Sequence, residues 1–315
     1  MITAICVPKK ILYLEILDSS MYISNVITTT ATICRTTDDK MEFIKITSAQ
    51  NDAVKHLVKL RDRRKREKEQ LTILEGYREL TRAVEYGMEL VECYFSPRHF
   101  LGENEYPLLE SLAERGIPVR ELAPQLLEKV TYRDRPEGLL AVAKMRRHTL
   151  DDLPVDPKGL YLVAETVEKP GNLGSMLRSA DAVNATGVII CERGTDIYNP
   201  NVIRASTGAL FSVPLAECDN QSAKEWLKKH NILTLAATPH TDNCYTDVDL
   251  TQGVAIVVGA EQTGLTDFWM NGADLPVVIP MLGKIDSLNV ATATTILLYE
   301  AVRQRKFPGF KGAGK

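Results

Sequence analysis

Residues 277–305 read VVIPMLGKIDSLNVATATTILLYEAVRQR. The apolar run Val277–Ile279 predicts a short strand that ends at Pro280, because proline cannot donate to a sheet. A long helix is expected from about Ser287, since apolar residues recur along wide faces of the segment. Its first turn is unusual, because Ser287 and Asn289 are polar in an otherwise apolar element. They either cap the helix or belong to a site, and the stretch by itself favours capping.

The composition indicates a globular protein. The chain has 315 residues, 44% hydrophobic and 25% charged, which suits two domains. It contains no apolar run of about eighteen residues and no basic leader segment, so we expect no membrane partner. Six cysteines are scattered without CxxC pairs or nearby histidines. This pattern argues against a zinc site and favours free thiols in a cytoplasmic protein.

The chain divides into four segments by its patterning. Residues 1–40 are rich in Thr, Ile and Ser without a helical period, and we expect an extension outside the main fold, as if translation started at Met41. Strand and helix patterns over residues 43–145 predict a small α/β domain, and the Pro- and Asp-rich residues 146–158 predict a linker. Residues 159–315 alternate apolar strands with helices, which predicts a mostly parallel sheet covered on both faces.

A basic segment lies in the first of these domains. Between Ile44 and Gln70, nine Lys or Arg stand against four Asp or Glu, a local charge of 9 − 4 = +5. Such a run is usually a solvated helix face, and it is also the charge pattern expected of a phosphate-binding surface. The candidate RNA contacts are Lys59, Arg61, Arg63, Arg64 and Arg66.

Ligands of parallel sheets bind beyond the carboxyl ends of the strands. That rule selects three loops, residues 165–172, 259–264 and 280–289. The first lacks the GxGxxG and GxxxxGK patterns, which disfavours a nicotinamide dehydrogenase or a P-loop enzyme. Its Asn172 and the following Arg178 either bind a phosphate or ribose, or cap a helix and pair at the surface. In the second loop, Glu261 follows a strand between two glycines and either contacts a ligand or caps the next helix.

Taken together, the loops resemble the three motifs of the SpoU (TrmH-type) family of RNA ribose 2′-O-methyltransferases, a branch of the SPOUT superfamily. The first motif matches at Asn172–Ala180 and the second at Gly259–Leu265. The third matches at Ile279–Met281, at Ser287–Asn289 and along the helix to Arg305. The resemblance covers residues 160–305, and residues 44–144 more weakly resemble the ribosomal-protein-like substrate-binding domain of many members. Three motifs in the right order and spacing are highly specific, so the site interpretation of Ser287 and Asn289 now outweighs capping.

The resemblance implies a trefoil-knotted domain that binds S-adenosylmethionine, and a homodimer whose active sites take residues from both subunits. The catalytic set that it implies is Asn172, Arg178, Glu261, Ser287 and Asn289. The cofactor set that it implies is Ala237, Thr238, Gly259, Ile279, Leu288 and Asn289. In the family proposal Arg178 is the base, but guanidinium keeps its proton to a pH above about 12, so a phosphate clamp is physically easier.

The expected function is 2′-O-methylation of a ribose in structured RNA, with ribosomal RNA favoured over transfer RNA. No metal is expected, because the methyl group on a sulfonium is already activated. The alternative from another class is a non-catalytic RNA-binding module on the same fold.

Overall fold

A computed structural model describes residues 41–192 and 194–309. The expectation for residues 1–40 lies outside this described part. Within it, no helix is long and apolar enough to cross a membrane.

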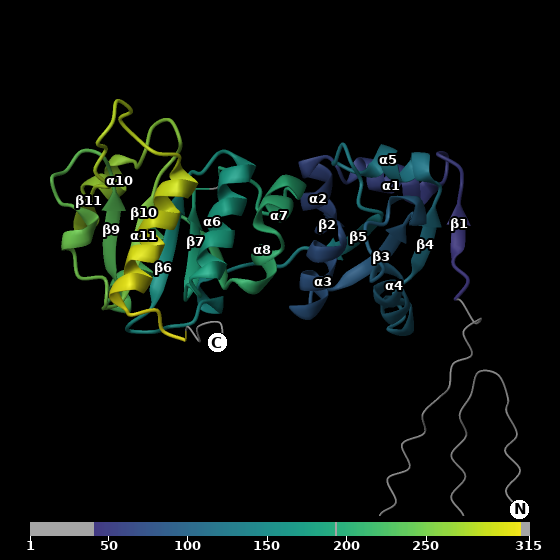
Figure 1. Cartoon of the computed structure of the whole chain (residues 1–315), viewed down its shortest axis with the longest axis horizontal. Coiled ribbons are helices and arrows are strands. Elements are labelled where there is room, and N and C mark those ends of the chain that lie inside the picture. The colour runs from purple at the N-terminus through teal and green to yellow at the C-terminus, as the bar shows by residue number, and fades with distance from the viewer. Residues whose placement is uncertain (1–40, 193, 310–315) are drawn as a thin grey trace, which may run out of the picture. The chain divides into compact units, whose positions relative to one another are not determined.

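The first half of the described chain contains a five-stranded sheet in the order β1-β4-β3-β5-β2 (Figure 1). Its strands are β1 Ile44–Ile46, β2 Leu71–Glu75, β3 Leu90–Phe95, β4 Val119–Leu122 and β5 Leu139–Lys144. Its helices are α1 Asp52–Lys59, α2 Arg63–Glu69, α3 Tyr77–Glu85, α4 Glu105–Glu114 and α5 Pro124–Val130, with short 3-10 turns η1 Pro97–His99 and η2 Leu150–Asp152. β1 is an edge strand, and Asn51 caps α1 by accepting from the amide of Ala53.

The second half contains a six-stranded sheet in the order β11-β9-β10-β6-β7-β8, in which every pair is parallel. Its strands are β6 Leu160–Glu165, β7 Gly187–Cys191, β8 Leu215–Cys218, β9 Leu233–Ala237, β10 Val254–Val258 and β11 Leu275–Val277. Its helices are α6 Pro170–Ala182, α7 Pro200–Ser206, α8 Ala209–Ser212, α9 Asn220–Lys229, α10 Asp267–Met270 and α11 Val290–Gln304, with the 3-10 turn η3 Tyr245–Asp247.

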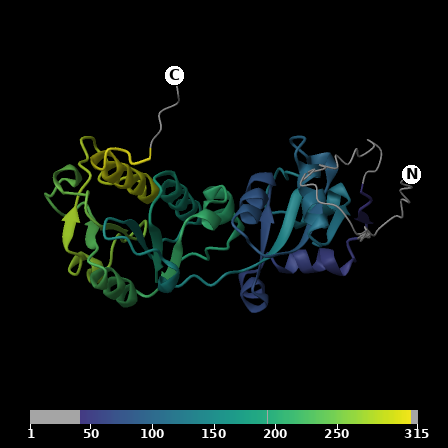
Figure 2. The same ribbon diagram turned by 90° about the horizontal axis from the view of Figure 1, so that it is seen from below.

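Helices cover both faces of this sheet, which confirms the predicted architecture. The apolar sides of α6 and α11 join one core, through residues such as Leu177 and Leu298. On the other face, Leu227 of α9 and Trp269 of α10 belong to a second core. Figure 2 shows the yellow α11 beside the teal α6 on one face of the sheet. The largely buried helix expected after residue 287 is therefore present.

Three element boundaries differ from the predictions. The strand expected at Val277–Ile279 ends at Val277 and includes Pro276, which is tolerated because β11 is an edge strand. Helix α11 begins at Val290 rather than near Ser287, because Asn289 is the cap. The sequence pattern predicts a helix over residues 174–183, and helix α6 begins earlier, at Pro170, a favoured first helical residue.

Three short elements also differ. The sequence predictions missed β8 and α10, which are only four residues each. The sequence pattern predicts a single helix over residues 202–209, whereas the structure has two helices there, α7 and α8. The break falls at Thr207 and Gly208, whose φ angles of 52° and 85° are left-handed.

Candidate active site

A cavity of about 1020 Å³ lies at the carboxyl ends of β9, β10 and β11. We call it the large cavity; it is lined by residues from the segments 237–240, 258–265, 277–281 and 286–290, with contributions from Lys169, α10 and α11. Cavities of roughly 300–1,000 Å³ hold cofactor-sized ligands. Its lining includes every predicted cofactor residue, namely Ala237, Thr238, Gly259, Ile279, Leu288 and Asn289.

Gly259 lets the loop after β10 fold back closely on itself. The backbones of Ala260 and Gly264 exchange two hydrogen bonds of 3.0 Å each. A Cβ at Gly259 would lie 2.2 Å from the carbonyl carbon of Gly264, so only glycine fits without moving the backbone. The loop therefore presents close-packed main chain, rather than a side chain, beside the cavity.

A chain of hydrogen bonds joins the three motifs at the edge of the large cavity. The Asn172 amide nitrogen donates to Oε1 of Glu261 over 2.7 Å, and the Asn289 amide nitrogen donates to Oδ1 of Asn172 over 3.0 Å. Asn289 also caps α11, because its Oδ1 accepts from the amides of Ala291 and Thr292. The capping and site interpretations of Asn289 are thus compatible.

Glu261 clasps the start of α6. Its carboxylate accepts from the backbone amides of Glu168 and Lys169 at 3.0 and 3.1 Å, besides the side chain of Asn172. Partial burial acts to raise the pKa of Glu261, but these hydrogen bonds outweigh it and hold the pKa below the usual glutamate value. The alternative that Glu261 caps the next helix is wrong, since α10 begins only at Asp267.

Ser287 and Arg178 lie outside this hydrogen-bonded chain. Ser287 lines the large cavity, is exposed, and donates to Oδ1 of Asp286 over 3.3 Å. Arg178 is exposed on α6, about two turns beyond Asn172, and does not line the cavity. Within residues 41–192 and 194–309, no hydrogen bond or ion pair is recorded for its side chain. Of the five predicted catalytic residues, Glu261, Ser287 and Asn289 line the large cavity. Asn172 is hydrogen-bonded to two of them, and Arg178 stands apart.

Comparison with known proteins gives the family. Residues 159–299 match the SpoU rRNA Methylase family, and residues 51–141 match the MRM3-like substrate binding domain. A 23S rRNA uridine 2′-O-methyltransferase of Streptomyces viridochromogenes is 33% identical over 253 residues, covering 78% of this chain and 87% of that protein. The chain belongs to the SpoU rRNA methylase family.

Solved structures of SpoU relatives share the fold. A crystal structure of an RNA 2′-O ribose methyltransferase is 39% identical with a TM-score of 0.73, covering 84% of this chain and 100% of its own. The AdoMet-bound rRNA methyltransferase from Sinorhizobium meliloti is 27% identical with a TM-score of 0.75, covering 82% and 97%. The mostly parallel α/β methyltransferase fold and the N-terminal substrate-binding domain are thereby confirmed.

The predicted RNA contacts separate into two groups in this SpoU protein. Four of them are exposed on or beside α1 and α2, namely Lys59, Arg61, Arg63 and Arg64. Arg66, in contrast, is 2% exposed and forms a 2.6 Å ion pair with Asp196. Its guanidinium also donates to the carbonyls of Leu60 and Arg61. The expectation that Arg66 contacts RNA does not hold, because Arg66 lies on the buried face of α2.

Lys169 and His240 are basic-type side chains among the lining residues of the large cavity that were not predicted. Lys169 stands directly before α6, and its amide is bonded to Glu261. His240 follows the predicted residue Thr238 by two positions. Lys169 lies within the selected loop 165–172, whereas His240 lies outside all three selected loops and near only the predicted residue Thr238. Lys169 places a basic side chain beside a site expected to receive a polyanion.

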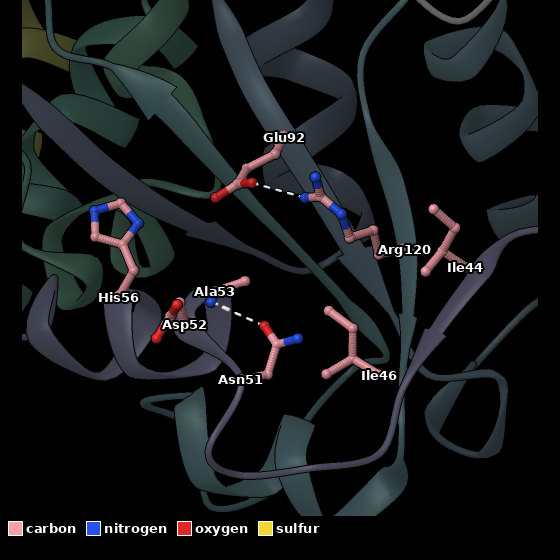
Figure 3. Close-up of a pocket in the computed structure, with 8 residues that line it drawn as sticks. All are labelled: Ile44, Ile46, Asn51, Asp52, Ala53, His56, Glu92 and Arg120. Carbon is pink, nitrogen blue, oxygen red and sulfur yellow. Dashed lines mark hydrogen bonds and ion pairs between the residues drawn. The ribbon is translucent and has the colours of Figure 1, made fainter.

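A second hollow, of about 460 Å³, lies between β1 and the start of α1 (Figure 3). Its polar side chains already have partners: Arg120 donates to Glu92 over 2.9 Å, Asn51 accepts from the amide of Ala53, and His56 bonds Glu69 outside the hollow. This hollow offers fewer groups for a ligand than the large cavity does. Among the described residues, no cluster of three or more His, Cys, Asp or Glu side chains could hold a metal ion.

Proposed function

We propose that this chain transfers a methyl group from S-adenosylmethionine to a ribose 2′-oxygen in ribosomal RNA. The observation that carries the proposal is the hydrogen-bonded chain Glu261–Asn172–Asn289 at the edge of the large cavity. SpoU membership supports an S-adenosylmethionine-dependent RNA methyltransferase. The 23S rRNA substrate named for the Streptomyces relative favours ribosomal over transfer RNA.

The large cavity fits the cofactor. Its volume suits a nucleoside-sized ligand, and the close-packed main chain at Gly259 offers a surface on which a flat ring can lie. We propose that the backbones of Gly259, Ile279 and Leu288 hold the adenosine, with Ala237 and Thr238 as the wall. When bound, S-adenosylmethionine supplies a methyl group already activated on a sulfonium.

The remaining site residues act by positioning the ribose. Glu261 fixes the amide of Asn172, so the Asn172 oxygen faces the nitrogen of Asn289. We propose that this pair orients the ribose and that the exposed Ser287 hydroxyl contacts it. Good alignment of two reactants can lower a barrier by about 7–11 kcal/mol. Lys169 can bind a flanking phosphate from the same rim.

We propose that the protein is a homodimer and that Arg178 serves the partner's active site. The support is the position of Arg178, exposed and outside the lining of the large cavity of its own chain. A guanidinium that arrives from the other subunit would bind the RNA phosphate beside the target ribose and stabilise charge on the 2′-oxygen.

Mixed dimers test this arrangement. Arg178→Ala and Glu261→Ala subunits are each expected to be inactive alone. Mixing by refolding or co-expression should restore about a quarter of wild-type activity, because half of the random dimers are mixed and each has one intact site. No restoration in dimers shown to be mixed would place Arg178 in the site of its own chain.

The domain assignment follows from the same proposal. We propose that residues 43–145 form the RNA-binding domain and residues 159–315 the methyltransferase domain, with residues 146–158 as the linker between them. The proposed RNA contacts are Lys59, Arg61, Arg63 and Arg64. The trefoil knot stays a prediction for that domain. A cytoplasmic location is proposed because the expected substrate is ribosomal RNA.

Methyl transfer to isolated RNA tests the function itself. The protein is incubated with tritiated S-adenosylmethionine and total RNA from cells that lack its gene, with Glu261→Ala as the inactive control. Label in ribosomal RNA, followed by ribose-methylation mapping, is expected. Label only in transfer RNA would favour that substrate, and no label in any RNA would favour the non-catalytic module.

A further inference from the structure

Glu165 is a buried carboxylate that neither the cavity lining nor the sequence motifs include. It is the last residue of β6 and is 0% exposed. Three donors bind it: Thr266 donates its backbone amide to Oε2 over 2.8 Å and its hydroxyl to Oε1 over 2.6 Å, and the Asn220 amide donates to Oε1 over 2.6 Å. Both carboxylate oxygens are therefore occupied.

The orientation of Asn220 is fixed from its other side. Asn220 begins α9, and its Oδ1 accepts from the indole nitrogen of Trp269 over 2.7 Å. Trp269 lies in α10 and is fully buried. Because the indole can only donate, the Asn220 nitrogen must face Glu165. Glu165 thus holds together the end of β6, the start of α9 and the cap of α10.

Thr266 stands at the exit of the loop that forms one wall of the large cavity. That loop enters from β10 at Gly259 and is closed by the paired backbones of Ala260 and Gly264. Its exit is Thr266, the residue bound twice by Glu165. Glu261 lies in the chain between Gly259 and Thr266. The hydrogen bonds from Thr266 to Glu165 therefore help to set the position of the loop and of the Glu261 carboxylate.

We propose that Glu165 is a positioning residue that holds the Gly259–Leu265 loop in the conformation that binds S-adenosylmethionine. The inference rests on the proposed function, because it assigns the large cavity to that cofactor. Glu165 does not touch the cavity, so it acts through Thr266. Glutamine at this position has one acceptor oxygen, and in either orientation its NH₂ group faces a donor of Thr266 or Asn220.

The test measures cofactor binding separately from stability in the full-length protein. Titration calorimetry gives the Kd for S-adenosylmethionine, and thermal unfolding gives Tm for Glu165→Gln, Thr266→Val and Thr266→Ser. We expect Glu165→Gln to raise the Kd for S-adenosylmethionine by roughly tenfold to a hundredfold, the change that corresponds to losing a hydrogen bond to a buried carboxylate. Thr266→Val, which lacks the hydroxyl, should bind S-adenosylmethionine more weakly than the wild type. Thr266→Ser, which keeps the hydroxyl, should bind it with the wild-type Kd.

Asp274→Asn is the matched control. Asp274 accepts from the amide and hydroxyl of Thr234 at 2.8 and 2.6 Å, the same donor types that Thr266 offers to Glu165. This pair lies at the amino end of β9, the opposite edge of the sheet from the large cavity. Asp274→Asn should lower Tm and leave the Kd for S-adenosylmethionine unchanged.

The outcomes separate the two proposals. The positioning role is supported if the wild-type protein binds S-adenosylmethionine and folded Glu165→Gln binds it more weakly. If Glu165→Gln does not fold, weaker binding by folded Thr266→Val supports the role instead. Wild-type binding with the same Kd in these variants, whatever their Tm, overturns it and leaves the proposed function intact. Failure of the wild-type protein to bind S-adenosylmethionine overturns both.

Discussion

Replacement of Glu261 by glutamine probes the clasp between the loop after β10 and the start of α6. In the wild type, Oε1 accepts from Lys169 and Asn172, and Oε2 accepts from Glu168. Glutamine removes the charge and turns an NH₂ group toward at least one of these donors. A hydrogen bond to a charged group contributes about 1.5–3 kcal/mol. We take the lower end, because Glu261 is only partly buried and water can replace part of the loss.

A loss of about 1.5–2 kcal/mol corresponds to a decrease in kcat/KM of roughly ten- to thirtyfold. The assay is methyl transfer from tritiated S-adenosylmethionine to ribosomal RNA, with Tm measured in parallel. Glu105→Gln is the control, since Glu105 accepts from the amides of Leu101 and Gly102 in the first half of the chain, away from the large cavity. Glu105→Gln should lower Tm and leave kcat/KM unchanged. A Glu261→Gln enzyme within twofold of the wild-type kcat/KM would refute the reasoning.

The pH dependence of the clasp has a definite sign. The pKa of Glu261 is lowered in the folded protein, so its contribution to the free energy of unfolding is fully present above the pKa of an unfolded glutamate, about 4.3. That contribution is lost as the pH falls through the lower folded pKa. The stability difference between wild type and Glu261→Gln should therefore be constant from about pH 7 to 5 and shrink below the ordinary glutamate range.

Three further changes test the assigned roles. Arg63→Gln with Arg64→Gln should weaken RNA binding and reduce its dependence on log salt by about one per lost phosphate contact, with the Kd for S-adenosylmethionine unchanged; an unaltered salt slope would mark a solvated helix face. Arg66→Met removes the ion-pair partner of buried Asp196, so denaturant titration should show a free energy of unfolding lower by about 3–5 kcal/mol. The salt dependence of RNA binding should stay as in the wild type. Gly259→Ala should weaken cofactor binding in calorimetry by at least about tenfold, whereas Gly283→Ala, where a Cβ meets nothing within 4 Å, should bind as wild type.

Local sequence patterns predicted the second sheet well and its boundaries less well. The apolar run Val254–Val258 predicts a strand over these residues, and β10 has the same bounds, because a strand buried on both faces is apolar throughout. Asn289 shows the limit of such patterns. Both Ser287 and Asn289 are good caps, and the structure shows that Asn289 is the cap and also donates to Asn172, which is 117 residues away in the chain.

Arg66 and Glu165 show the same limit for charged residues. Arg66 stands in a basic run, and only the packing of α2 shows that it faces Asp196, 130 residues away, rather than solvent. Glu165 ends an apolar strand, where a sequence suggests either a surface carboxylate or a ligand contact. Its partners Asn220 and Thr266 reach it because the ends of separate strands meet at one edge of the sheet.

The sequence by itself determined the alternation of strands and helices, and hence a parallel sheet with its site loops at one edge. It also determined the motif residues in those loops, because both properties depend on short-range patterns. Only the tertiary structure decided which side chains meet: that Asn172 joins Glu261 to Asn289, that Arg178 stands apart, and that Arg66 is buried. The physical reason is that hydrogen-bond partners are set by the order of strands in the sheet, which places β10 beside β6, and no local pattern encodes that order.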